Sequence, residues 1–171
     1  AASDVYKRQD EASLLRHYLS SGQAEGRKPS ARGKAGDSLK LTNEQIALVW
    51  SPVPLKDLAN YKSLKKKMTD EQYQAAYQEA VNLVLPVALS SREEQLTYIA
   101  AALRERFDSG MSYSMDADHY NDPYGYFVLG SASCAGCTRA TGLCLNVLGI
   151  SYEHVNENQY SHQWCLSLIH I

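Results

Sequence analysis

The residues that could do chemistry are gathered in one segment, Gly130 to Trp164. Cys134 follows a turn of small residues and opens a stretch that predicts a helix ending before Gly149, a residue suited to the left-handed position after a helix. A thiol at the start of a helix lies at the positive end of the helix dipole, beside unpaired backbone N–H groups. Both features stabilise a thiolate, the nucleophilic form of cysteine. The pattern therefore predicts a nucleophile at Cys134.

A base is expected to face this thiol. Residues 150–156 are predicted to form a strand, residues 157–159 a turn, and residues 160–165 a second strand that brings His162 back to the start of the helix. An imidazole there can take the thiol proton and later return it to a leaving group. His154, on the first of these strands, is the alternative base.

The other cysteines allow rival interpretations. The chain has four, and none lies in its first two thirds: Cys134, Cys137, Cys144 and Cys165. Such clustering does not suit a disulfide framework. The C-x-x-C spacing at Cys134 and Cys137 also occurs in redox pairs at helix starts, and a zinc site would need further ligands from Cys144, His154 or His162. We interpret Cys137 and Cys144 mainly as small buried residues of the helix, with the redox and zinc sites as alternatives.

Two helices are predicted before this segment. Thr69 with Gln72 fits a capping box, and apolar residues then recur at helical spacing. Ser91 with Glu94 fits a second capping box, followed by one buried apolar stripe.

A polar, turn-rich segment leads to Cys134. Residues 111–115 are predicted to be extended, and residues 116–124 to form a loop. His119 in this loop is expected to be solvated. Residues 124–126 either line the entrance of a cleft or pack as core aromatics.

Both ends of the chain match a sequencing adapter. Residues 1–9 correspond to one reading frame of a transposon-based adapter and residues 166–171 to its reverse complement, so we treat both as artefacts. Residues 10–41 are predicted to be an N-terminal helix and a flexible linker rich in Gly, Ser, Lys and Arg. The domain itself is expected to span residues 42–165.

The composition excludes two classes of protein. The formal net charge is −2, whereas a nucleic-acid-binding domain needs a basic face and a high isoelectric point. No apolar run approaches the roughly 20 residues that a membrane-spanning helix needs. We therefore expect neither a nucleic-acid partner nor a membrane segment, and the oligomeric state stays open.

The segment from the small-residue turn to Trp164 resembles the transglutaminase-like superfamily. In that family a Gly-rich turn delivers a cysteine to the start of the core helix, the helix ends in a Leu-Gly-Ile type of sequence, and His-x-Trp follows on a strand. Here these features correspond to Cys134, residues 148–150 and residues 162–164. Tyr113 lies where the family commonly has a tyrosine-containing strand. The resemblance covers about residues 92–165.

The resemblance implies an α+β, papain-like fold, in which helices pack on a small antiparallel sheet. Cys134 would be the nucleophile and His162 the base of a Cys-His-Asp triad, with no metal or cofactor. His154 lacks the tryptophan that follows the family's histidine. The family's acid lies on the strand after the histidine, so we expect it beyond residue 165, with the sheet truncated and the fragment inactive. The aspartates of residues 116–122 precede Cys134 and do not fit this order.

The implied activity is that of a thiol enzyme on a protein or peptide substrate. A peptidase or amidase is favoured over a transamidase by analogy with bacterial-type relatives. The alternatives are a non-catalytic binding or scaffold domain on the same fold and the C-x-x-C redox or metal protein. The cellular location stays open, with a lean towards an extracytoplasmic or cell-surface address.

Overall fold

The computed structural model describes residues 41–167, so the helix and linker predicted over residues 10–41 lie almost entirely outside the described part. The chain divides into two compact units, Ala1–Ser51 and Pro52–Ile171. The described part of the first unit holds helix α2 (Asn43–Val49), which begins at a capping box formed by Thr42 and Gln45. The second unit carries the candidate site, and the domain start near residue 42 stays a prediction.

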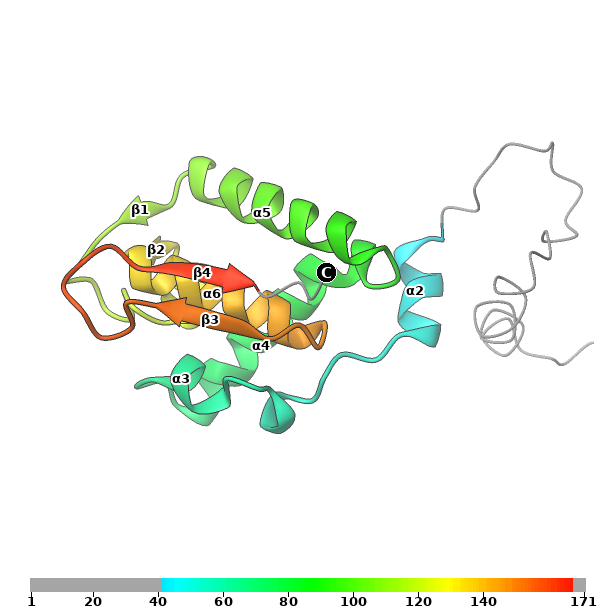
Figure 1. Ribbon diagram of the computed structural model, residues 1–171, viewed down its shortest axis with the longest axis horizontal. Coiled ribbons are helices and arrows are strands. Elements are labelled where there is room, and N and C mark those ends of the chain that lie inside the picture. Colours follow the sequence, from blue (N-terminus) through cyan, green and yellow to red (C-terminus); the bar gives the residue numbers. More distant parts are fainter. Residues whose placement is uncertain (1–40, 168–171) are drawn as a thin grey trace, which may run out of the picture. The chain divides into compact units, whose positions relative to one another are not determined.

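Helices make up most of the second unit (Figure 1). In chain order they are the short η3 (Leu55–Asp57) and α3 (Tyr61–Lys65), then α4 (Asp70–Val84), the short η4 (Leu85–Val87) and α5 (Arg92–Asp108). Both predicted capping boxes are present, at Thr69 for α4 and at Ser91 for α5. The helices therefore begin where the sequence predicts, because each cap satisfies backbone N–H groups at its helix start.

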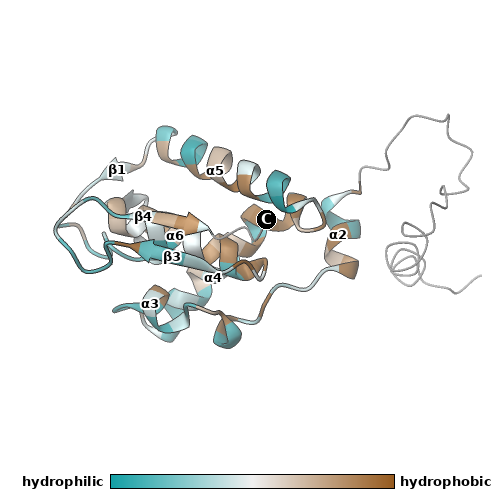
Figure 2. Cartoon of the chain, viewed as in Figure 1, coloured by the Kyte–Doolittle hydropathy of each residue, from teal (hydrophilic) through white to brown (hydrophobic). Residues whose placement is uncertain are grey.

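Helix α6 (Cys134–Val147) is the centre of this unit. All its residues except Cys134, Cys137 and Thr141 are buried, and it packs against α4, α5 and three strands. It ends as predicted, with Gly149 in the left-handed region at φ 73°. The N–H groups of Gly149 and Ile150 donate to the carbonyls of Asn146 and Leu145, a pairing that closes the helix end. By contrast α5 buries only three residues, and Figure 2 shows hydrophilic residues on its successive turns.

Two small sheets flank α6. Strands β1 (Ser112–Tyr113) and β2 (Ser131–Ala132) pair in parallel, and a π-helical turn, η5 (Gly125–Leu129), lies between them in the chain. Strands β3 (Tyr152–Val155) and β4 (Trp164–Ser167) pair antiparallel. The class is thus mixed α+β with small sheets, as the sequence predicts.

The β3–β4 hairpin differs from the prediction in its second strand. We expected a strand from Tyr160, but β4 begins at Trp164. Residues 156–163 form a long connection instead, in which Asn156 and Asn158 have left-handed backbones that interrupt an extended chain. Hydropathy alternation does not reveal such a bend. His162 therefore lies in the hairpin loop and not on a strand.

The far end of β4 includes two residues that the sequence assigns to the adapter. Leu166 pairs with Glu153 and Ser167 pairs with Tyr152. Backbone hydrogen bonds make this pairing, so it does not depend on the identity of these two side chains.

Candidate active site

Cys134 is the first residue of α6, and the chain just before it is firmly anchored. The N–H and hydroxyl of Ser133 both reach the carbonyl of Tyr120, at 2.7 and 3.2 Å. Ser133 consequently makes no side-chain capping bond to the helix. Backbone N–H groups of the first turn are therefore left without a side-chain cap, and such groups can stabilise an oxyanion beside the thiol.

Tyr113 brings a hydroxyl to the same thiol. In the β1–β2 register Tyr113 is opposite Ala132, two residues before Cys134. Partial burial raises the pKa of Tyr113. A hydrogen bond to the Cys134 side chain raises this pKa further, whereas a hydrogen bond from the Cys134 backbone N–H lowers it. Tyr113 and Cys134 line the same cleft.

Cys134 and His162 line one cleft of about 500 Å³. Its other walls come from the end of α3, from β1 and the residues after it, from the loop before η5, and from the hairpin loop. Figure 1 shows β1, β2 and the hairpin loop at the same end of α6. The structure therefore brings together the two residues that the sequence selects, although they lie on different elements.

His162 is exposed on the rim of this cleft. Its ring stacks on Trp164, with 6.2 Å between centroids and 24° between planes, and its backbone carbonyl accepts a bond from Asn156. Within residues 41–167 no hydrogen bond joins the His162 ring to the Cys134 thiol or to a carboxylate. Thiol–imidazole pairs often tighten only when a substrate binds. The structure thus shows a shared cleft and not a closed catalytic pair.

Polar contacts hold the hairpin loop against α6. Arg139, on α6, is only 1% exposed and donates to the carbonyls of Ser63 and Asn121 and, at 2.9 Å, to the carboxylate of Glu157. The Ser63 hydroxyl donates to the same carboxylate at 2.6 Å. Burial tends to raise the pKa of Glu157, but the bonds from Ser63 and Arg139 outweigh it, so the pKa lies below its usual range. The charged carboxylate is therefore the form that fastens the loop.

His154 is less suited to be the base. It is half-buried on β3 and does not line the cleft of Cys134. Its Nε2 pairs with the Gln163 side-chain oxygen at 2.7 Å, while its Nδ1 is buried without a partner among the described residues. Burial lowers the pKa of His154, and the nearby Arg139 charge lowers it further. The contacts of His154 therefore point towards positioning the hairpin loop.

The prediction of a solvated His119 is wrong. Its side chain is 18% exposed, and Nδ1 lies 2.6 Å from the carboxylate of Asp122, which is 1% exposed. Its Nε2 lies 3.1 Å from the side-chain amide of Gln72 on α4. The other Asp122 oxygen accepts the N–H groups of Tyr124 and Gly125. The His119–Asp122 pair is local, but the sequence does not show that Gln72 of α4 contacts the other ring nitrogen of His119. Together these contacts fix the loop that anchors Ser133.

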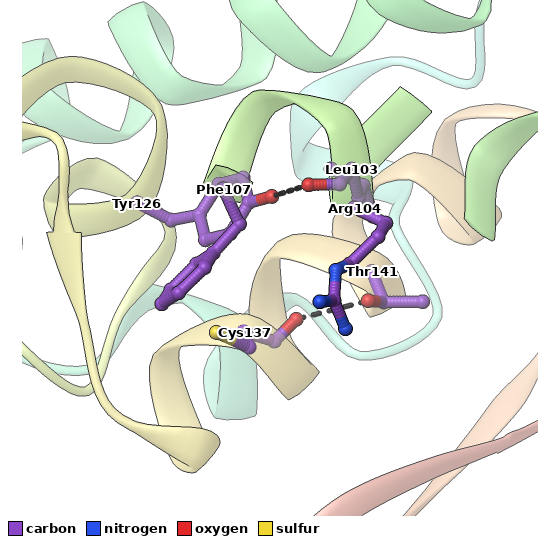
Figure 3. A pocket seen from close by; sticks show the side chains of 6 residues that line it. All are labelled: Leu103, Arg104, Phe107, Tyr126, Cys137 and Thr141. Carbon is purple, nitrogen blue, oxygen red and sulfur yellow. Dashed lines mark hydrogen bonds between the residues drawn. The ribbon is translucent and has the colours of Figure 1, made fainter. Parts of the chain in front are cut away.

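The other cysteines are placed differently from Cys134. Cys137 lines a separate pocket of about 250 Å³, together with Leu103, Arg104, Phe107, Tyr126 and Thr141 (Figure 3). Burial raises the pKa of Cys137 to about 11 and that of Cys165 to about 12, and it also raises the pKa of the fully buried Cys144. These three thiols are thus poor nucleophiles.

Aromatic residues after the polar loop have a packing role. Tyr126 is buried and donates to the Leu103 carbonyl on α5 at 2.6 Å, as Figure 3 shows. Gly125 is buried as well, and neither residue lines the Cys134 cleft. Tyr126 and Gly125 therefore pack in the core and do not line the entrance of the cleft.

Within residues 41–167 no group of three or more His, Cys, Asp and Glu side chains could hold a metal. The helices in that range are all too short or too polar to cross a membrane. A scan of protein-family models, a search of curated proteins and a search of solved structures found no match to this chain.

Several cleft residues were not selected from the sequence. Lys66 stands in a run of three lysines, and Asn121, Asn158 and Tyr160 lie in polar segments, so none carries a motif. They reach the cleft through the tertiary fold. Tyr113 is the exception, since the family resemblance singled it out.

Proposed function

We propose that the Pro52–Ile171 unit is a transglutaminase-like thiol enzyme with a papain-like core, acting on a peptide or carboxamide. The observation that carries the proposal is the position of Cys134 at the start of a buried helix, in one cleft with His162. The antiparallel hairpin that packs on α6 is consistent with such a core. Hydrolysis by a peptidase or amidase is favoured over transamidation by analogy alone.

The chemistry follows from the groups in the cleft. The Cys134 sulfur attacks the carbonyl carbon while the thiol proton passes to His162. Backbone N–H groups at the start of α6, with the Tyr113 hydroxyl, stabilise the oxyanion, and each such donor is typically worth about 10²–10³ in rate. The carbon–nitrogen bond then breaks, and the amine leaves with the proton from His162. Water, or a second amine, attacks the thioester with His162 again as base and frees Cys134.

The third member of the triad is proposed to follow β4, as the family order implies. Its role would be to orient the imidazole and stabilise its charged form. In the described part of the chain, Trp164 stacks on His162 and restrains one face of the imidazole. The redox alternative is not favoured, because Cys137 lines a different pocket from Cys134.

Alkylation of the thiols tests this proposal. The full chain is treated with iodoacetamide at about pH 6, where a stabilised thiolate still reacts and ordinary thiols do not, and each cysteine is followed by peptide mass spectrometry. Cys134 is expected to react much faster than Cys137 and Cys165. His162→Ala should slow Cys134 strongly, whereas His154→Ala, which loosens the loop through Gln163 but keeps the base, should slow it less.

Two outcomes would overturn the assignment. Equal alkylation rates for Cys134 and Cys137 would contradict the assignment of Cys134 as the nucleophile. A loss of Cys134 reactivity in His154→Ala and not in His162→Ala would transfer the role of base to His154.

A further inference from the structure

We propose that the Cys134 cleft takes an acidic peptide segment, and that Lys66 recognises a carboxylate close to the acyl group that Cys134 attacks. This inference rests on the proposed function and adds a substrate class to it. Lys66 follows α3, far from Cys134 in the chain, and lines the same cleft.

The charges of the lining residues carry the argument. The basic groups of the wall are Lys66, Arg139 and the exposed imidazole of His162, and no carboxylate among the described residues lines the cleft. Arg139 is compensated by Glu157 at 2.9 Å. Lys66 instead donates to the neutral side-chain oxygen of Asn158 at 2.8 Å. Of the lysine and arginine side chains in the wall, Lys66 is therefore the one without a directly bonded carboxylate in the described part of the chain.

The surroundings of Lys66 make an anion favourable there. Burial lowers the pKa of Lys66, and the nearby Arg139 charge lowers it further. Glu157 raises this pKa only in part, because its carboxylate is already bonded to Arg139 and Ser63. A bound carboxylate would stabilise the charged ammonium in this half-buried place. The same attraction would draw an acidic substrate towards the cleft.

The rim suits the rest of a peptide. Tyr113, Met115 and Tyr160 line the cleft and are strongly exposed, Tyr160 completely so. They offer apolar surface to neighbouring side chains. The side-chain amides of Asn121 and Gln159, which also line the cleft, offer donors and acceptors to a peptide backbone. The volume, about 500 Å³, is that of an ordinary ligand pocket.

The experiment compares two small reagents that differ in charge. The full chain is alkylated with iodoacetate, which carries a carboxylate, and with neutral iodoacetamide, and the rates at Cys134 are expressed as a ratio. Lys66→Met is expected to lower this ratio about three- to tenfold, the effect of one ammonium facing a partly solvated cleft. Lys66→Arg should keep most of the ratio.

Two controls separate charge from shape. Lys62→Met removes an exposed lysine of α3 that does not line the cleft, and it should leave the ratio unchanged. Asn158→Gly removes the bond to Lys66, keeps the charge and tolerates the left-handed backbone at this position, so it should also preserve the ratio. A ratio unaffected by Lys66→Met, or lowered equally by Lys62→Met, would overturn the inference. The proposed function fails separately, if Cys134 reacts with neither reagent faster than Cys137.

Discussion

The two walls of the cleft are built in opposite ways. The wall that carries Cys134 is the start of a buried helix, and Ser133 just before it is fastened to the Tyr120 carbonyl by two hydrogen bonds. The wall that carries His162 is an exposed hairpin loop of residues 156–163. Thus the thiol is held by the core of the unit, whereas the imidazole is held by a few polar contacts.

This difference assigns separate tasks to the two walls. A nucleophile at a fixed helix start has its oxyanion donors already in place, which favours the charged transition state. A base on a loop can approach the thiol as the substrate enters. Arg139 links the walls, because it lies on the helix and bonds Glu157 of the loop.

The largest effect on this arrangement is expected from Arg139→Met. The substitution leaves two backbone carbonyls without their Arg139 donor and Glu157 with Ser63 alone, and unsatisfied buried acceptors cost about 1–3 kcal/mol each. Urea unfolding should show this loss, and alkylation of Cys134 should become insensitive to His162→Ala because the loop is released.

Arg104→Met is the matched control for this experiment. Arg104 is 78% exposed and pairs with Asp108 on the same helix, so its loss should cost about 0.5 kcal/mol or less. If both substitutions had the same small cost, the buried link between the walls would be refuted.

The helix wall was largely predictable from the sequence. Thr69 and Ser91 as caps, Cys134 as a helix start and Gly149 as a helix end are local signals, and each depends on residues within one or two turns. The structure confirms all four. The mixed α+β class, which the family resemblance implies, is also observed.

The hairpin wall was less predictable for a physical reason. The loop geometry depends on left-handed Asn156 and Asn158 and on the bond from Arg139 to Glu157, which joins separate elements. The same holds for the contact between His119 and Gln72, which comes from α4. Such contacts between distant residues leave no periodicity in the sequence. The choice of Cys134 and His162 itself stays a prediction, which the shared cleft supports.

Two glycine substitutions in α6 test the two walls of the cleft separately, and each is expected to have an intermediate effect on the free energy of unfolding. A Cβ at Gly136 would overlap the Tyr120 carbonyl oxygen, on the Cys134 side, whereas a Cβ at Gly142 would overlap the Tyr152 ring, on the hairpin side. Both changes to alanine gain the same helix propensity, so the difference between them reports on packing. We expect each to destabilise the unit by about 1–3 kcal/mol in urea unfolding.

Their effects on the thiol should differ. Gly136→Ala should slow alkylation of Cys134, because Tyr120 anchors the residue before it. Gly142→Ala should leave that rate near the wild-type value and change the fluorescence of Trp164 on β4 instead. Equal slowing in the two variants would mean that the walls are not mechanically separate.

The smallest effect concerns the pH dependence of the loop contact. The pKa of Glu157 is lowered from a usual value of 4.5, so its charged form contributes stability that is full above that value and is lost as the pH falls through the lowered pKa. Glu157→Gln keeps the side-chain shape and removes the charge. It should cost about 1 kcal/mol in urea unfolding near neutral pH. This difference from wild type should shrink as the pH falls below 4.5. A difference that stays constant through the acidic range would show that the charge of Glu157 does not hold the loop.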